Sequence, residues 1–345
     1  MQKMKKYISI DLFSGAGGMS EGLKMANFRT KYAFEIDPIA AMTYKLNHRR
    51  TKVFTQDIRT VDTNDILKGL NGKPIHLLAG CPPCQGFSSI RRLNRGKPAE
   101  DERNYLINEY VRFVDALHPY TIMLENVPGL QMSDDFNRAI DHLREIGYSV
   151  DYEILNVKDY GVPQNRKRLV LVGSRLGEIH VAKATHERST VRSTIAAMPE
   201  PENSDDVIHN IYPHHIQRIQ QLINLIPHDG GSLRDLGEEW QLECHKSINV
   251  GFNDVYGRLR WDSYSTTITG GCLNPSKGRF LHPEQDRCIS AREASLLQTF
   301  PSDYIFPTNV AKTKIALMIG NALPPKFCFV QASNIKNHLD TILNN

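Results

Sequence analysis

The 345-residue sequence has no hydrophobic run long enough for a membrane helix and no secretory signal. A membrane helix needs roughly 18 or more consecutive apolar residues, and no stretch of the chain approaches that length. The N-terminus is basic, but the short apolar stretch after it soon meets Asp11, which predicts a first strand rather than a signal peptide. These absences predict a soluble cytoplasmic protein without a membrane partner.

Cysteine is also scarce, and its spacing argues against a zinc site. Among six cysteines only Cys81 and Cys84 form a close pair, and a second CxxC is missing. No metal site is therefore predicted. Without a secretory signal disulfides are not expected either, so the thiols are free and each is a candidate nucleophile.

Neither sign of charge dominates the composition, with 42 Lys+Arg against 38 Asp+Glu and a formal net charge of +4. This excess is too small to indicate a nucleic-acid partner, which would instead need a local basic groove. Internal repeats and low-complexity segments are absent as well. At about 150 residues per domain, the length predicts two domains or one large elaborated one.

Strand-like and helix-like stretches alternate through the first half of the chain. Strands are expected at residues 7–13, 32–36, 53–58, 75–80, 120–126 and 169–173, and helices at 19–27, 38–48, 102–118 and 134–147. This alternation is typical of an α/β fold with an open, doubly wound, mostly parallel sheet. Ligands of such sheets bind at the carboxyl ends of the strands.

The pattern changes near residue 180, and the chain is then loop-rich until helical spacing returns at residue 311. We therefore expect a catalytic and cofactor-binding domain at 1–180. A smaller irregular domain with a hinge is expected at 181–306, and a C-terminal segment, 307–345, is expected to return to the first domain.

A glycine-rich segment, residues 11–18, lies where the first predicted strand turns into a helix. Its glycines let a ligand approach the backbone, and the helix N-terminus offers free N–H donors, although a tight turn alone would look the same. Glu35 ends the second strand, where it can bind ribose hydroxyls, and Asp57 ends the third, where it can meet an adenine amino group. A nicotinamide cofactor is disfavoured because no third glycine follows at the dinucleotide spacing.

A second loop, residues 80–88, follows the fourth predicted strand and presents Cys84 at its tip between two prolines and Gln85. A buried thiol, half a zinc site or a redox pair are the alternatives, and the two prolines fit a redox CxxC poorly. Glu125 ends the next strand, beside the same pocket, unless it is a simple strand-end cap. A cysteine and a glutamate on neighbouring strand ends are typical of a nucleophile with an acid partner.

A basic run precedes the last predicted strand of the first domain. Arg166 and Arg168 alternate, so they are expected on one face, and one or both of them can enter the site while Lys167 stays solvated. A charged surface without function is the alternative reading.

Taken together, these motifs resemble the DNA cytosine-5 methyltransferase family of bacterial modification enzymes. Residues 11–20 are similar to its S-adenosylmethionine loop and residues 80–88 to its catalytic Pro-Cys-Gln loop. The later matches, in family order, are residues 125–127, 164–168, 257–259, 266–269, 278–280, 292–293 and 319–325. One departure is Cys81, where many members carry Gly or Phe, but the alignment still selects Cys84.

The resemblance implies a sheet of the S-adenosylmethionine-dependent methyltransferase type with a smaller target-recognition domain. S-adenosyl-L-methionine would be the cofactor and S-adenosyl-L-homocysteine the product. The implied cofactor-binding residues are Phe13, Ser14, Gly15, Gly17, Gly18, Glu35, Ile36, Asp57, Ile58 and Asn321.

The same resemblance implies a mechanism on a flipped-out cytosine. The Cys84 thiolate, favoured by nearby arginines, adds to C6 and makes C5 nucleophilic. Glu125 stabilises the charge that moves toward N3, and Arg168, with Arg166 as the other candidate, binds O2. The base that removes the C5 proton is not identified.

Double-stranded DNA is the implied partner, with a companion restriction endonuclease acting on the same site and a monomeric enzyme. The expected DNA contacts are Gln85, Ser88, Arg91, Arg92, Arg95 and Thr269, with base readout over residues 182–255. Two alternatives are an RNA cytosine-5 methyltransferase of the same architecture and a non-catalytic DNA-binding regulator. The long variable segment favours duplex DNA, and the intact Cys84, Glu125 and Arg168 favour an enzyme.

Overall fold

The computed structural model describes residues 7–83, 106–240 and 254–344, which fall into two compact units. The first unit comprises Met1–Tyr160, Lys167–Thr185 and Leu323–Asn345, and the second Gly161–Arg166 and His186–Ala322. Composition alone suggested boundaries at 180 and 307. The structure adds residues 161–166 and the helix before residue 322 to the second unit.

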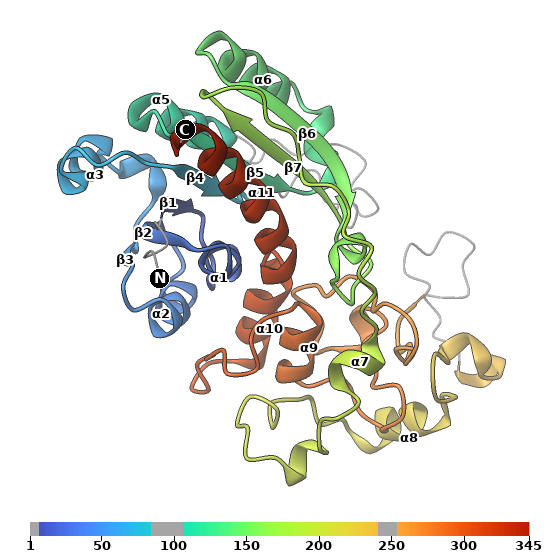
Figure 1. Ribbon diagram of the computed structural model, residues 1–345. Coiled ribbons are helices and arrows are strands. Elements are labelled where there is room, and N and C mark those ends of the chain that lie inside the picture. Colours follow the sequence, from blue (N-terminus) through green and yellow to red (C-terminus); the bar gives the residue numbers. More distant parts are fainter. Residues whose placement is uncertain (1–6, 84–105, 241–253, 345) are drawn as a thin grey trace. The chain divides into compact units, whose positions relative to one another are not determined.

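A seven-stranded sheet in the order β3-β2-β1-β4-β5-β7-β6 forms the centre of the first unit (Figure 1). Its strands are β1 (Tyr7–Leu12), β2 (Phe28–Phe34), β3 (Lys52–Phe54), β4 (Leu77–Gly80), β5 (Thr121–Asn126), β6 (Ser149–Asn156) and β7 (Lys167–Ser174). β1 to β5 pair in parallel, whereas β7 is antiparallel to both of its neighbours. The α/β fold with a mostly parallel sheet is thereby confirmed.

The first unit has six described α-helices, three of which begin at a capping side chain. They are α1 (Gly18–Met25), α2 (Pro38–Asn47), α3 (Thr63–Leu70), α5 (Leu106–Leu117), α6 (Asp134–Glu145) and α11 (Pro325–Leu343). Asp37 accepts the backbone N–H groups of residues 39 and 40 at the start of α2, and Ser133 accepts that of residue 136 in α6. The apolar faces of α5 and α6 bury Phe113 and Phe136 in the same core as strand residues such as Leu78.

The C-terminal helix α11 returns to the first unit and packs on α1. A Cβ on Gly22 would lie 2.5 Å from the Cβ of Cys328, so only glycine allows this approach. Lys312–Leu343 is long and apolar enough to cross a membrane by composition, but 67% of its most apolar window is buried inside the protein. Its apolar character is explained by core packing of two separate helices, which meet at residues 322–324.

The second unit is irregular, and its described residues form isolated bridges rather than a sheet. Its α-helices are α7 (Val191–Ile195), α8 (Gln217–Leu225), α9 (Ala291–Leu297) and α10 (Lys312–Asn321). Arg258, which is fully buried, donates hydrogen bonds to four backbone carbonyls, those of residues 223, 226, 282 and 285. A buried guanidinium thus supplies the donors that these loop carbonyls lack without a sheet.

Candidate functional site

The carboxyl ends of the central strands lie side by side in the first unit. Leu12 pairs with Gly80, and Gly80 pairs with Leu124, so these three positions are in register across β1, β4 and β5. The next residue along each strand is Phe13, Cys81 or Glu125. Phe13, which the sequence assigns to the cofactor, and Glu125, which it assigns to the reaction, therefore share one edge of the sheet.

The turn after β1 has the conformation that a backbone ligand site requires. Gly15 and Gly17 have φ of 53° and 98°, and even Phe13 has a φ of 58°. The backbone N–H of Ser14 donates to the carbonyl of Phe34 at 2.9 Å, which holds the turn against the end of β2. Around Gly15 the space where a side chain would lie is open, so a ligand can reach the backbone there.

Glu35 lies at the end of β2 and holds the glycine turn. Its Oε2 accepts the backbone N–H of Gly15 at 2.8 Å, and its Oε1 accepts that of Asp37 at 2.7 Å. Burial raises the pKa of this carboxyl above its ordinary value, although these hydrogen bonds oppose the shift. A carboxylate has about four acceptor sites, so Glu35 keeps sites for ligand hydroxyls.

Asp11 is a residue that the sequence reasoning missed. Only 1% of Asp11 is exposed; its Oδ2 accepts a hydrogen bond from Ser20 Oγ at 2.6 Å. Its Oδ1 has no hydrogen-bond partner among the described residues, and burial raises the pKa of the carboxyl to about 7. A buried carboxylate oxygen without a donor beside a glycine turn fits a cationic ligand group. The available signal was an acid inside an otherwise apolar strand.

The remaining cofactor candidates differ in what they offer. Ile36 is 64% exposed beside Glu35, so it provides an uncovered apolar surface for a flat ring, whereas Ile58 is buried in the core. Asp57 caps a short helix and forms an ion pair with Arg59, which lowers the pKa of Asp57. An adenine amino group would have to share this carboxylate with Arg59.

Glu125 and Arg168 form a buried ion pair. Arg168 Nε lies 2.7 Å from Glu125 Oε1, and the side chains are only 14% and 8% exposed, respectively. The antiparallel pairing of β5 with β7 explains this contact, because Glu125 is opposite Val170. Arg168 is then a diagonal neighbour on the same face, within reach of a long side chain.

Cys81 has the chemistry of a neutral thiol. Burial and the neighbouring carboxylate of Glu125 raise the pKa of Cys81 well above its ordinary value. Asn126 donates its side-chain amide to the carbonyl of Pro82 at 2.8 Å, which fixes this loop to the end of β5. The other predicted loop residues, Cys84, Gln85, Ser88, Arg91, Arg92 and Arg95, lie outside the described residues.

Arg166 differs from the expectation that it shares a face with Arg168. β7 begins at residue 167, and Arg166 belongs to the second unit, where it is 3% exposed. Its Nη1 donates to the carbonyls of Ile268 at 2.8 Å and Gly320 at 3.0 Å. Arg166 therefore binds the backbone carbonyls of the residues that directly precede Thr269 and Asn321.

Thr269 and Asn321 are thus brought together within the second unit. A Cβ on Gly320 would lie 2.0 Å from the carbonyl carbon of Thr269, so glycine is required where α10 approaches this segment. Gln164 binds the same segment through its Oε1, which accepts the backbone N–H of Ile268 at 2.8 Å. The predicted site residues accordingly form two sets, one in each unit.

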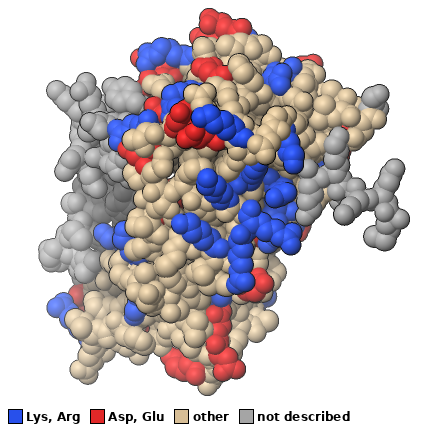
Figure 2. All heavy atoms as spheres, turned by 90° about the vertical axis from the view of Figure 1, so that its left-hand side faces the viewer, with Lys and Arg blue, Asp and Glu red and all other residues tan. Residues whose placement is uncertain are grey.

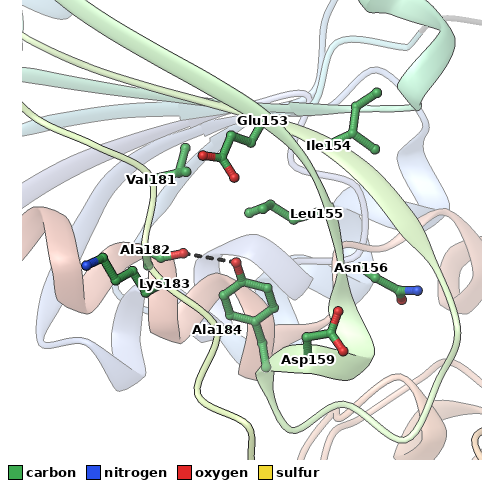
Figure 3. Close-up of a pocket in the computed structure, with 10 residues that line it drawn as sticks. Glu153, Ile154, Leu155, Asn156, Asp159, Val181, Ala182, Lys183 and Ala184 are labelled. Carbon is green, nitrogen blue, oxygen red and sulfur yellow. Dashed lines mark hydrogen bonds between the residues drawn. The ribbon is translucent and has the colours of Figure 1, made fainter.

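A surface pocket of about 360 Å³ lies elsewhere in the first unit (Figure 3). It is bounded by the end of β6 and residues 181–184, and the hydroxyl of Tyr160 donates to the carbonyl of Ala182 across it. Charged side chains of both signs, Glu153, Asp159 and Lys183, line it. None of the predicted catalytic or cofactor-binding residues contributes to this pocket, although Ala182, Lys183 and Ala184 begin the segment 182–255 that is expected to read bases.

Comparisons with known proteins agree over nearly the whole chain. The family model described as C-5 cytosine-specific DNA methylase matches residues 7–337. Type II methylase M.HgiDII of Herpetosiphon aurantiacus is 35% identical, with 96% of this chain and 95% of the relative covered. Type II methyltransferase M1.HphI of Haemophilus parahaemolyticus is 33% identical, with 92% and 83% covered.

Solved structures show the same fold. A DNA modification methyltransferase encoded within an E. coli prophage superposes with a TM-score of 0.71 at 25% identity, covering 99% of this chain and 100% of that one. The S. pombe Dnmt2 methyltransferase gives a TM-score of 0.67 at 21% identity, with the same coverage.

Proposed function

Because the chain belongs to the C-5 cytosine-specific DNA methylase family and methylates C5 of cytosine in DNA, we propose the roles of its residues as follows. Cys84 is the nucleophile, Glu125 is its acid partner, and Arg168 is the cation that binds the base. The observation that carries this proposal is the buried Glu125–Arg168 ion pair at the strand end beside Cys81.

The reaction needs a nucleophile because C5 of cytosine, as part of an electron-poor aromatic ring, is too weak a nucleophile to be methylated unaided. The sulfur of Cys84 forms a bond to C6, and the electron pair of the C5–C6 double bond makes C5 nucleophilic. C5 is then methylated. A base removes the C5 proton, and the C6–S bond breaks to regenerate the Cys84 thiolate. Base flipping, which is typical of the family, exposes C5 and C6.

Glu125 and Arg168 stabilise the charge of this addition. Negative charge develops along the N3–C2–O2 side of the ring, where a proton shared between the Glu125 carboxylate and N3 and a guanidinium N–H at O2 lower its energy. The ion pair fixes both groups before the base arrives, so little reorganisation is needed. Arg166 supports the second unit and is not assigned to the base, because two backbone carbonyls occupy its guanidinium.

Cys84 is assigned rather than Cys81 because it occupies the Pro-Cys-Gln position of the family, and the surroundings of Cys81 agree with this choice. A thiolate, not a thiol, attacks carbon, and the raised pKa of Cys81 keeps that sulfur protonated. In this assignment Cys81 is a neutral neighbour of Glu125.

Family members use S-adenosylmethionine, and we assign its site to the β1 and β2 ends. When bound, it supplies an electrophilic methyl group. The open space at Gly15, the carboxylate of Glu35 and the exposed face of Ile36 would hold the nucleoside part. The unpartnered Oδ1 of Asp11 would face a cationic part of the ligand, and S-adenosyl-L-homocysteine would leave as product.

We further assign sequence recognition to residues 182–255 and catalysis to the first unit. The Type II names of the relatives suggest a companion restriction endonuclease. We infer in addition that the enzyme acts on double-stranded DNA as a cytoplasmic monomer. Exchanging residues 182–255 for those of a relative with another target should move the methylated site. A folded, active chimera that keeps the original site would exclude this division.

Bisulfite sequencing tests the function directly. DNA from cells that express the chain should carry 5-methylcytosine at one sequence context, and DNA from cells expressing Cys84→Ser should carry none. Unmethylated DNA in the presence of folded wild-type protein would refute the assignment of activity.

A further inference from the structure

Residues 28–56 form one part of the sequence with an excess of positive charge. This segment has six basic and two acidic residues, an excess of four, which equals the formal charge of the whole chain. The other 316 residues carry 36 basic and 36 acidic residues and are balanced. A local excess in an otherwise neutral chain indicates a specific surface rather than a generally basic protein.

A single hydrogen bond brings the basic residues of this segment together. Thr51 Oγ1 donates to the carbonyl of Thr30 at 2.9 Å, which fixes the turn before β3 against β2. Thr30 lies between Arg29 and Lys31, and Thr51 is preceded by two arginines and followed by a lysine. The basic cluster, defined here as Arg29, Lys31, Arg49, Arg50 and Lys52, therefore surrounds one contact.

Most of the basic cluster is exposed and has no acidic partner. Arg29, Arg49, Arg50 and Lys52 are exposed, and none forms an ion pair within the part of the chain that the structure describes. Lys31 is half-buried and donates to the carbonyl of Gly69. Figure 2 shows the face at the left of Figure 1, with α2 and α3, and Lys and Arg atoms gather across its middle.

The basic cluster lies far from the edge of the sheet that carries the reaction. Arg29 is near the start of β2 and Glu35 follows its end, six residues later, which at about 3.3 Å per residue places them roughly 20 Å apart. Lys52 is likewise the first residue of β3, which pairs in parallel with β2. The cluster is thus at the amino ends of the strands, and the cofactor and catalytic residues are at the carboxyl ends.

We propose that the basic cluster is a second contact surface for the phosphate backbone of duplex DNA, separate from the catalytic site. The charges are spread over a strand, a turn and a second strand, so they fit a linear polyanion better than one small anion. The proposal rests on DNA being the substrate, since this supplies such a polyanion. The surface adds affinity that is independent of sequence and holds DNA between methylation events.

The dependence of DNA affinity on salt concentration measures this contact. Each phosphate that a cation neutralises on B-DNA contributes about 0.9 to the slope of log affinity against log salt, so Arg49→Gln/Arg50→Gln should reduce the slope by about 1.8. The probe is a labelled duplex of about 40 alternating A·T base pairs, which contains no cytosine and reports backbone binding only. Thermal unfolding and methyl transfer at saturating cytosine-containing DNA should be unchanged.

Arg138→Gln/Arg144→Gln is the matched control, because it removes two exposed charges from α6, which packs on β6 at the other edge of the sheet. Its slope should equal that of the wild type. If the cluster variant and the control variant had the same salt slope, the proposal would be overturned. If the cluster variant keeps its DNA slope but loses binding to polyglutamate, the surface takes an acidic protein and the proposal is wrong. If the wild-type protein transferred no methyl group, the proposed function would be refuted. The comparison of salt slopes would still show whether the basic cluster binds DNA phosphates.

Discussion

Replacing Arg168 with methionine tests the central ion pair of the proposed mechanism. The variant leaves Glu125, which is 8% exposed, without its cation in a site that water hardly reaches. Removing one partner of a buried ion pair typically costs about 3–5 kcal/mol of stability. Arg168→Met should therefore destabilise the protein strongly at neutral pH.

Urea unfolding at neutral pH measures the penalty, with Lys167→Met as the control that removes a neighbouring exposed cation. In a Glu125→Gln background the same Arg168→Met change should cost much less, because no charge is left unpaired. Single-turnover methyl transfer should fall by about 10²–10³-fold, as expected for a lost oxyanion donor. A penalty no larger than that of Lys167→Met, or methyl transfer within tenfold of the wild type, would refute the reasoning.

Three further predictions concern the nucleophile and the cofactor site. DNA that carries 5-fluorocytosine should trap Cys81→Ser in a denaturation-resistant complex but not Cys84→Ser, and an adduct mapped to Cys81 would exclude the assignment. Glu35→Ala should weaken S-adenosylmethionine binding by about 1–3 kcal/mol because its polar partners lose their acceptor; unchanged affinity in calorimetry of the folded variant would remove Glu35 from the site. The pKa of Asp11 is about 7 in the folded protein, above the value of about 3.9 for an unfolded aspartate. Stability should therefore fall by roughly 3 kcal/mol between pH 4 and 7, and Asp11→Asn should flatten this part of the profile; an identical profile would contradict a buried ionising Asp11.

Short apolar runs in the sequence correctly predicted the buried strands of the sheet, because the burial of a strand is visible in its own residues. The strands that end at Leu12, Gly80 and Asn126 are buried on both faces and read as short apolar runs, so their carboxyl ends could be located to within a residue. β2 starts at Phe28 rather than residue 32, because Arg29 and Lys31 interrupt the apolar run without interrupting the strand. Polar side chains at alternate positions are compatible with a half-exposed strand.

Two elements of the first unit were missed for related reasons. β6 has mostly half-buried or exposed residues, and α3 has only two buried residues, Ile66 and Leu70. Neither segment presents the apolar signal that a buried element requires, and both are held by tertiary contacts that periodicity does not report.

The basic run at residues 164–168 shows why a side chain's face is harder to predict than its secondary structure. Alternation places Arg166 and Arg168 on one face only if both belong to one strand, but β7 begins between them, at residue 167. The chain passes from the second unit to the first at that residue, so Arg166 binds carbonyls of the second unit and Arg168 pairs with Glu125. The register of β5 and β7, which decides that pairing, depends on residues more than forty positions apart in the sequence.

Asp11 illustrates the opposite case, a residue that local reasoning could have identified. An ionisable group inside an apolar parallel strand conflicts with the burial pattern around it, and such conflicts concentrate at functional sites. The single hydrogen bond from Ser20 leaves one carboxylate oxygen without a donor, and the structure does not otherwise compensate for burying the charge. A bound cation would supply that compensation, so the instability of ionised Asp11 in the free protein and its affinity for a cationic ligand have the same physical origin.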